Sequence, residues 1–344
     1  MLNKRNFLKS CAITVLGIAL SASLFAQINS TNGLRVGIIG LDTSHSMAFA
    51  KALNDPAAGD NFGGYKVVAA YPQGSLDIKS SVERIEGNTE EIKKMGIEIV
   101  NSVDDLLKKV DVVLLETNDG RRHLEQALPV LKAGKRMFID KPMTASLTDA
   151  MIIFDASRHY NVPVFSASSL RYIKGMQEIK DGAIGKVVGA ETYSPAYLEK
   201  THPDFFWYGI HGVEILFTAM GTGCKTVVRV STTDTDVAIG TWKDGRIGTF
   251  RGLRADKKDY GGLIFGEKEI MPLGAYNGYN PLLIEIIKYF KTGIIPVSSE
   301  ETLEILAFME AADVSKKRGG IPVSVEKIME KARKESKKYK FSER

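Results

Sequence analysis

The sequence predicts an α/β protein with two domains: an N-terminal Rossmann-type, doubly wound parallel sheet, then a C-terminal α+β domain with a mainly antiparallel open sheet. Short apolar runs alternate with helix-like segments over residues 33–168, an order typical of parallel sheets. Over residues 169–344, Thr- and Val-rich runs follow one another through short turns, which indicates antiparallel strands. A length of 344 residues is enough for two such domains.

Strands of the first domain are expected at the apolar runs 34–39, 65–70, 97–100, 110–115, 136–139 and 162–165. The first helix follows three candidate N-cap residues, Asp42, Thr43 and Ser44. Further helices are expected at 90–95, from Ser102 onward, at 122–133 and at 147–160. This strand–helix alternation is what a doubly wound sheet requires.

In the second domain we expect a helix at 174–180 and then strands at 186–193, 225–232, 236–242, 247–253 and 263–265. Turn-like pairs such as Asp244-Gly245 and Gly261-Gly262 separate these strands, and no helix lies between most of them. Helices return at 281–291, 300–317 and 325–338. The second domain is therefore expected to combine one sheet with several helices.

The first 26 residues are interpreted as a signal peptide. They have a basic start, an apolar run at 11–20 and then small residues before a cleavage site between Ala26 and Gln27. Lys4-Arg5 also resembles the start of a twin-arginine export signal, and a retained N-terminal anchor is the alternative. We expect an exported, periplasmic protein with no membrane attachment after the leader is removed.

Composition and charge exclude several classes of protein. The 44% apolar and 25% charged residues argue against disorder and against several membrane spans. The net charge of +5 comes from the basic segments 1–9 and 327–344, so the body of the chain has no basic excess for nucleic-acid binding. Removal of the leader would leave Cys224 without a disulfide partner, either as a small core residue or as a nucleophile.

The first strand–turn–helix unit is where a dinucleotide would bind, but its glycine fingerprint is incomplete. Gly40 keeps the first glycine of G-x-G-x-x-G, whereas Asp42 and His45 replace the second and third. A carboxylate at the second position would repel a diphosphate, and Asp42 could simply cap the helix. Tyr71-Pro72 stands where an acidic ribose ligand is usual, although Gln73 or Ser75 could hydrogen-bond a ribose.

Four motifs in order resemble one known family. They are Leu114-Leu115-Glu116-Thr117-Asn118 with His123 and Ala133-Gly134-Lys135, Asp140-Lys141-Pro142, Ala183-Ile184-Gly185-Lys186-Val187-Val188, and Gly293-Ile294-Ile295-Pro296 with the segments 300–302 and 311–315. Together they resemble the Gfo/Idh/MocA family of sugar- and polyol-handling oxidoreductases over most of residues 34–324. Asp140 is a conservative change from the Glu of the family's Glu-Lys-Pro motif.

The resemblance implies NAD or NADP as the cofactor. The residues that it places around the cofactor are Gly40, Asp42, Thr43, Ser44, His45, Thr117, Asn118, His123, Asp140 and Lys141. Neither a ribose acid nor a clear arginine for a 2′-phosphate is visible in the sequence, so the choice between NAD and NADP stays open.

The resemblance also assigns the catalytic roles. Lys141 would lie near the nicotinamide and the substrate hydroxyl, and His211 would act as acid and base. Hydride transfer from an alcohol needs a group that accepts the hydroxyl proton, and an imidazole is suited to this near neutral pH. A nearby ammonium stabilises the developing alkoxide. The alternatives are a solvated lysine at a strand end and a histidine that packs a helix.

Several residues near these two are candidate substrate ligands: Arg171, Tyr172, Trp207 and Tyr208. Trp207 replaces an Asp that the family often has four residues before its histidine, and Glu214 stands close to the family's later acid. Phe205 and Phe206 could join Trp207 and Tyr208 in a sugar-stacking wall or lie in the core. Arg171 could instead form a structural salt bridge.

No metal site is expected. His202 and Asp204 are close in sequence, but no third ligand follows at helix or hairpin spacing.

Three functions remain possible at this point. The first is an NAD(P)-dependent oxidoreductase acting on a sugar, polyol or keto-sugar. The second is a glycoside hydrolase or lyase that retains NAD and works through a 3-keto sugar. The third is a non-catalytic sugar-binding relic of the same fold. In each case the partner is a small carbohydrate, and family analogy implies a homo-oligomer.

Overall fold

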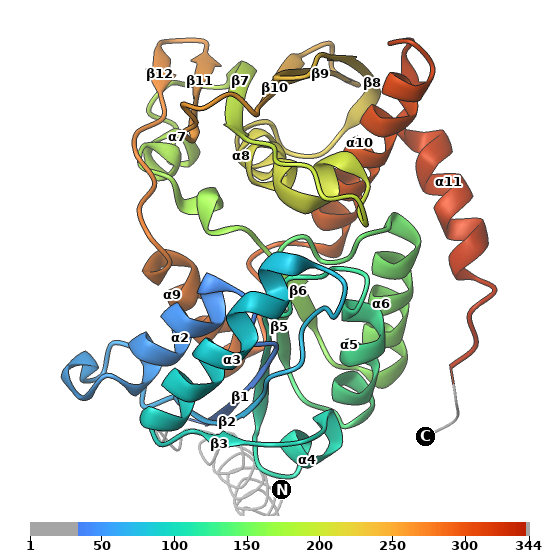
Figure 1. Ribbon diagram of the computed structural model, residues 1–344. Coiled ribbons are helices and arrows are strands. Elements are labelled where there is room, and N and C mark those ends of the chain that lie inside the picture. The colour runs from blue at the N-terminus through green and yellow to red at the C-terminus, as the bar shows by residue number, and fades with distance from the viewer. Residues whose placement is uncertain (1–33, 342–344) are drawn as a thin grey trace, which may run out of the picture. The chain divides into compact units, whose positions relative to one another are not determined.

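The computed structural model describes residues 34–341. The leader and its cleavage site lie outside the described residues, so export stays a prediction. Figure 1 shows two sheets, each accompanied by helices. Within residues 34–341, no helix is long and apolar enough to cross a bilayer.

The first sheet has six parallel strands in the order β3-β2-β1-β4-β5-β6. The strands are β1 (Arg35–Ile39), β2 (Lys66–Tyr71), β3 (Glu98–Ile99), β4 (Val112–Leu115), β5 (Met137–Ile139) and β6 (Val164–Ser166). The helices between them are α2 (Ser44–Asn54), α3 (Lys79–Lys94), α4 (Val103–Leu107), α5 (His123–Lys132) and α6 (Leu147–Tyr160), with a 3₁₀ turn at Pro56–Ala58. The predicted Rossmann-type domain is confirmed.

Helix α3 is much longer than the segment 90–95 that the sequence indicated. Only Ser81 and Ile92 of its residues are buried, so most of the helix has no apolar stripe to reveal a period of 3.6 residues. Of the three candidate N-cap residues, Thr43 caps the first helix, because its side chain accepts the amide hydrogen of Ser46.

The second sheet has seven strands in the order β12-β11-β7-β10-β9-β8-β13, and every neighbouring pair except β7–β10 is antiparallel. Its strands are β7 (Val187–Pro195), β8 (Cys224–Ser231), β9 (Thr235–Trp242), β10 (Ile247–Leu253), β11 (Gly261–Gly266), β12 (Ile270–Pro272) and β13 (Val323–Ser324). The mainly antiparallel sheet is confirmed. The short strands β12 and β13 were not foreseen.

Helices accompany this sheet throughout. They are α7 (Met176–Lys180), α8 (Ile210–Met220), α9 (Asn280–Thr292), α10 (Ser299–Lys317) and α11 (Val325–Ser336), with a 3₁₀ turn at Ser169–Tyr172 and a π-helical turn at Phe205–Gly209. Cys224 is buried at the start of β8, and burial raises the pKa of its thiol, as expected for a core residue.

Helix α9 follows the second sheet in the chain but packs on the first. Leu282, Ile286 and Phe290 share a core with Val36 of β1 and Phe49 of α2. In Figure 1, α9 lies beside α2. The chain therefore returns to the first domain after β12, and this return carries the segment before α9 toward the edge of the parallel sheet.

Candidate active site

The carboxyl ends of β1 and β4 meet where the strand order of the parallel sheet reverses, the usual ligand crevice of such folds. Gly40 follows β1 with φ of +90°, and a Cβ there would lie 2.5 Å from the backbone of Thr117. Only glycine allows this backbone conformation and this close approach. The single glycine that the fingerprint retains is thus required by the local geometry.

A cavity of about 150 Å³ opens at this edge and receives residues from both domains. It is lined by Thr43, Ser44, His45, Arg84, Asn118, Lys141, Ser169, Leu170, Tyr208, His211, Tyr260, Tyr276 and Tyr279. The structure therefore brings together the predicted residues Thr43, Ser44, His45, Asn118, Lys141, Tyr208 and His211. Lys141 and His211, the predicted catalytic pair, come from different domains and share this one cavity.

His211 is a buried imidazole with a fixed orientation. Its Nδ1 atom lies 2.7 Å from the hydroxyl oxygen of Ser168, which also accepts the amide hydrogen of Leu170. Burial, and then the charge of Lys141, hold the pKa of His211 well below its usual value of 6.5. The ring is therefore neutral at neutral pH and able to accept a proton.

Lys141 lies directly after Asp140 at the end of β5 and is 9% exposed. The peptide bond between Lys141 and Pro142 is cis. The Nζ atom of Lys141 lies 3.8 Å from Oδ2 of Asp140. Burial raises the pKa of Asp140, but the charges of His45 and Lys141 outweigh it and lower that pKa to about 2. Asp140 is thus an anion beside the lysine ammonium.

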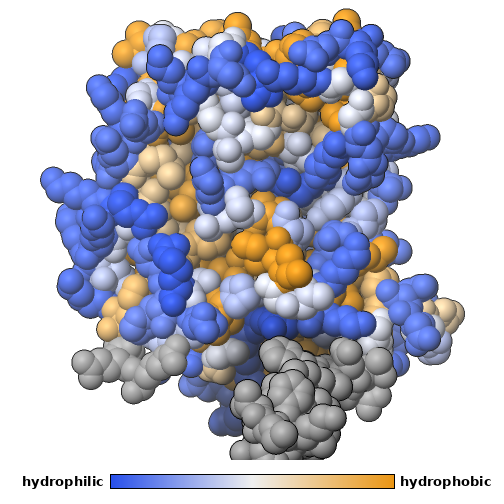
Figure 2. All heavy atoms as spheres, turned by 180° about the vertical axis from the view of Figure 1, so that it is seen from behind, coloured by the Kyte–Doolittle hydropathy of each residue, from blue (hydrophilic) through white to orange (hydrophobic). Residues whose placement is uncertain are grey.

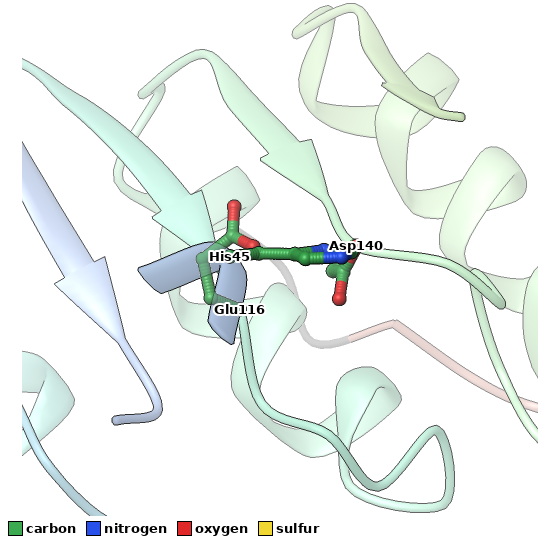
Figure 3. A group of neighbouring side chains, drawn as sticks. All are labelled: His45, Glu116 and Asp140. Atoms are coloured by element: carbon green, nitrogen blue, oxygen red, sulfur yellow. The ribbon is translucent and has the colours of Figure 1, made fainter. Parts of the chain in front are cut away.

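His45 occupies the third fingerprint position and points toward Asp140. Its Nδ1 atom lies 2.7 Å from Oδ1 of Asp140, and its ring packs edge-on against Tyr279. The side chain of Glu116, at the end of β4, lies beside this pair (Figure 3). Glu116 is fully buried, and burial, reinforced by the charge of Asp140, raises the pKa of Glu116 well above its usual value.

Tyrosine side chains form much of the remaining wall. The hydroxyls of Tyr208 and Tyr260 lie 3.0 Å apart, and the hydroxyl of Tyr276 lies 3.2 Å from that of Ser169. The hydroxyl of Tyr279 lies 2.9 Å from that of Ser44. Rings with polar tips suit a ligand that carries both hydroxyl groups and apolar C–H faces.

Asp42 does not bind the helix amides. Its fully buried carboxylate accepts hydrogen bonds from the backbone amides of Asn118 (3.0 Å) and Ser75 (3.4 Å). A Cβ at Gly74 would lie 2.1 Å from the same carboxylate, so the loop after β2 fits closely around it. Asp42 therefore bridges the loops after β2 and β4, on the side of the crevice where the adenosine half of a dinucleotide would lie.

A second bridge crosses the same side of the crevice. The guanidinium of Arg121, in the loop after β4, contacts Asp77 in the loop after β2 at 2.5 Å and Asp119 at 2.6 Å. These contacts raise the pKa of Arg121, which stays charged. Asp42 and Arg121 thus link the loops after β2 and β4 on the adenosine side.

Unlike the carboxylate of Asp42, the backbone amides of Thr43 and Ser44 are available to a ligand at the cavity. Among the described hydrogen bonds, none uses the backbone amide of either residue as a donor. These amides open helix α2 and lie at the cavity. Free amides at a helix N-terminus bind a diphosphate well.

Eight predicted site residues do not line the cavity: Gly40, Asp42, Thr117, His123, Asp140, Arg171, Tyr172 and Trp207. His123 is buried between the carbonyl oxygens of Thr117 (2.7 Å) and Met143 (2.9 Å). Arg171 is a structural cation, because it bonds Glu214 (2.9 Å) and also contacts Glu301. Arg171 and Tyr172 border a separate cavity of about 320 Å³.

Trp207 turns away from the cavity, and its ring packs against that of His202. Phe205 and Phe206 are core residues and do not form a sugar-stacking wall.

His202 and Asp204, the neighbouring residues considered as metal ligands, contact different residues in the structure. His202 lies 3.2 Å from Asp119, whereas Asp204 contacts Arg229 (2.8 Å) and Lys316 (2.7 Å). Their different partners explain why no site forms between them.

Sequence reasoning missed several cavity residues. Ser169 and Leu170 follow the last strand of the first sheet, and Tyr260, Tyr276 and Tyr279 lie between β10 and α9. Arg84 belongs to the polar helix α3. No local motif marks these residues, and Tyr276 and Tyr279 reach the cavity because α9 packs on the first domain.

Comparisons with known proteins support the fold and the family. Residues 34–168 match the model of an oxidoreductase family with an NAD-binding Rossmann fold, Gfo/Idh/MocA. A 1,5-anhydro-D-fructose reductase of Ensifer adhaerens is 30% identical over 105 residues, which are 29% of this chain and 31% of that protein. An uncharacterized oxidoreductase of Streptococcus pneumoniae is 27% identical over 121 residues, which are 33% of this chain and 32% of that protein. These matches span about a third of each relative.

Solved structures resemble the chain over both domains. A scyllo-inositol dehydrogenase from Lactobacillus casei, solved with NAD(H) and scyllo-inositol, has a TM-score of 0.67 at 16% identity, with 86% of this chain and 100% of that chain covered. A protein described as a probable dehydrogenase from Thermotoga maritima has a TM-score of 0.69 at 20% identity, with 86% and 100% covered. These likenesses concern the fold. The match over residues 34–168 supports a relationship of this part of the chain to the Gfo/Idh/MocA oxidoreductases, a family with an NAD-binding Rossmann fold.

Proposed function

We propose that this protein is an NAD(P)-dependent oxidoreductase that transfers a hydride between the nicotinamide and a carbon of a sugar, polyol or keto-sugar. The observation that carries the proposal is the convergence of Lys141 and His211 on one polar, tyrosine-lined cavity at the carboxyl edge of the parallel sheet. This edge is where ligands bind in doubly wound folds.

The residues at the cavity fit the diphosphate and nicotinamide half of the cofactor. Gly40 permits the tight turn after β1, the amides of Thr43 and Ser44 are available to a diphosphate, and Arg84 adds a cation. The bound nicotinamide supplies a hydride acceptor or donor. Asp42 and Arg121 would have to yield for the adenosine half to lie across the same crevice.

His211 is suited to accept the hydroxyl proton of an alcohol substrate. Its ring is neutral, and Ser168 fixes the side that carries Nδ1. Lys141 can then donate a hydrogen bond to the oxygen that becomes negative as the proton leaves. In the reverse direction, the protonated imidazole returns the proton to the carbonyl oxygen.

The tyrosine walls account for the substrate class. The hydroxyls of Tyr208, Tyr260 and Tyr276 face a small space with no carboxylate among its lining residues. A neutral polyhydroxylated ring matches such a wall better than a highly charged substrate does.

The proposal is tested by following nicotinamide absorbance while the purified protein is offered inositols, aldoses and 1,5-anhydro-sugars with NAD or NADP. We expect turnover of at least one substrate and a loss of at least about 100-fold in Lys141→Ala and in His211→Gln. Lys225→Ala and His159→Gln alter exposed residues and are the matched controls. Turnover that survives in both site variants would refute the assigned roles.

A non-catalytic sugar-binding protein is the second candidate. The observation that favours it is the pair of links that Asp42 and Arg121 form on the adenosine side. Such a protein would bind a sugar with unchanged affinity in Lys141→Ala and would show no affinity for NAD or NADP.

Two further properties belong to the proposal. The leader supports export to the periplasm. Self-association is supported by apolar side chains on the outer face of the second sheet, where Tyr193, Val230, Ile247 and Leu263 are all more than a third exposed. Figure 2 shows the molecule from behind, with apolar side chains along the upper edge, where the second sheet lies, and a further apolar patch near the centre of that face. Sedimentation of wild type and Ile247→Lys tests this interface.

A further inference from the structure

Three potential metal ligands converge beneath the cavity. His45 lies in the first turn of α2, Glu116 directly follows β4, and Asp140 directly follows β5. Because β1, β4 and β5 are neighbours in the sheet, these positions meet at one edge. Figure 3 shows the imidazole of His45 between the two carboxyl groups. The candidate ligand atoms of the three residues lie within 4.8 Å of one another, and all three side chains are buried.

The polar atoms of this cluster are not satisfied by the protein. Both carboxyl oxygens of Glu116, and Oδ2 of Asp140, are buried without a hydrogen-bond partner among the described residues. Buried polar groups in native proteins almost always have partners, so such orphans indicate a missing water or ion. Glu116 is entirely shielded from solvent, so its two oxygens without partners are the clearest indication of a missing water or ion.

The protein's own groups do not supply the missing partner. Within residues 34–341, Lys141 is the only lysine or arginine that forms an ion pair with the cluster, and its Nζ atom lies 3.8 Å from Oδ2 of Asp140, beyond hydrogen-bond distance. Glu116 has no ion pair in the part of the chain that the structure describes. The one ammonium therefore lies beside Asp140 alone, and a divalent cation would give Glu116 the partner that it lacks.

We propose that His45, Glu116 and Asp140 bind a divalent first-row transition metal through one imidazole nitrogen and carboxylate oxygens. An imidazole ligand favours Zn²⁺ or Mn²⁺ over Mg²⁺ and Ca²⁺, which prefer oxygen alone. The metal would replace the hydrogen bond between His45 and Asp140. The proton of that bond, and the proton that burial favours on Glu116, would leave to solvent. Three protein ligands leave at least one coordination position open.

The open position gives the site a chemical use. His45 also lines the cavity that contains Lys141 and His211. A metal held there can bind a substrate hydroxyl or carbonyl oxygen directly and polarise it. The site does not depend on nicotinamide binding, and it explains two residues that the family resemblance leaves unexplained, the histidine in the glycine fingerprint and the acid at the end of β4.

The test uses the mature chain without a histidine tag. The protein is stripped with a chelator, dialysed against Zn²⁺ or Mn²⁺, and assayed for metal content and for affinity by competition with a chromophoric chelator. We expect about one metal per chain in wild type and an affinity at least about 100-fold lower in Glu116→Gln and Asp140→Asn. His202→Gln is the control, because the side chain of His202 contacts Thr201, Asp119 and Trp207 and none of the three proposed ligands.

Two outcomes would overturn the proposal: wild type that binds no Zn²⁺ or Mn²⁺ below about 10 μM, or binding that Glu116→Gln leaves unchanged. If a variant fails to fold, anomalous scattering from wild-type crystals soaked in Zn²⁺ locates the metal. A peak away from these three side chains would refute the site. Affinity for NAD(H), measured separately on metal-free wild type, reports on the proposed oxidoreductase alone, so the two failures are distinguishable.

Discussion

The hydroxyl oxygen of Ser168 lies 2.7 Å from Nδ1 of His211, and this bond joins the end of the first domain to the helix that carries the proposed base. The family resemblance placed an acid in this role, and Trp207 replaces it in this chain. The serine comes from the parallel-sheet domain instead. The orientation of the base therefore depends on the contact between the two domains.

Ser168 is a positioning residue, and its removal should slow the chemistry without weakening substrate binding. Ser168→Ala frees the imidazole to rotate, so we expect kcat to fall about 10-fold, the cost of one hydrogen bond, while KM stays within about 2-fold. Ser168→Thr keeps the hydroxyl and should restore most of kcat. Steady-state kinetics of both variants make the check. A KM effect alone would indicate a merely structural role.

The lowered pKa of His211 predicts acid sensitivity of the fold. The unfolded chain binds a proton at this histidine below about pH 6.5, whereas the folded protein resists it because burial and Lys141 disfavour the charge. Since the unfolded state binds more protons, the free energy of unfolding should decrease as pH falls through 6.5. Urea denaturation of wild type and His211→Gln between pH 5 and 8 measures this. Equal slopes for the two proteins would contradict the prediction.

Asp42 should oppose dinucleotide binding. Asp42→Asn removes the negative charge and retains the size of the side chain, so we expect affinity for NAD(H) to rise about 10-fold, equivalent to about 1.4 kcal/mol. The variant should also lose about 1–3 kcal/mol of stability, because the amide offers a single acceptor oxygen to Asn118 and Ser75. Fluorescence titration and denaturation measure the two effects. Asp60→Asn, in an exposed turn, serves as the comparison.

Gly40 should tolerate no side chain. Gly40→Ala places a Cβ 2.5 Å from the Thr117 backbone at a φ of +90°, so we expect a loss of about 3 kcal/mol or more. Gly87→Ala is the matched control, because Gly87 lies in helix α3 with nothing within 4 Å of an added Cβ. It should stabilise the protein by about 0.5–1 kcal/mol. Thermal unfolding of Gly40→Ala and Gly87→Ala measures the difference. Equal melting temperatures would contradict the close approach of residue 40 to the Thr117 backbone.

The two sheets could be predicted from the sequence because apolar runs and turns are local signals. Lys141 was found for a similar reason, since a lysine at the end of a parallel strand lies at the ligand edge. The tyrosines before α9 could not be found, because nothing in their neighbourhood indicates that α9 packs on the first domain. The sequence left Arg171 as a substrate ligand or a structural salt bridge, because its partners, Glu214 and Glu301, are distant in the chain, and the structure supports the salt bridge.

Asp42 and Glu116 show the limit of motif reasoning at a single site. The sequence identifies Asp42 as an acid in a glycine position, but not that its carboxylate would bond the loops after β2 and β4 and leave the helix amides free. Glu116 belongs to the motif at residues 114–118, but the resemblance assigns it no role, since a strand end accepts many residues. Its importance emerges only when its buried oxygens are seen without partners.

The most direct test of the central proposal is whether the folded protein binds nicotinamide dinucleotide beside Lys141 and His211. Native mass spectrometry of the purified chain, followed by NADH fluorescence titration of wild type and Lys141→Ala, measures this. We predict one dinucleotide per chain, with binding weakened in Lys141→Ala. No bound cofactor in the purified protein, together with no affinity for added NAD(H) or NADP(H), would contradict the proposed oxidoreductase.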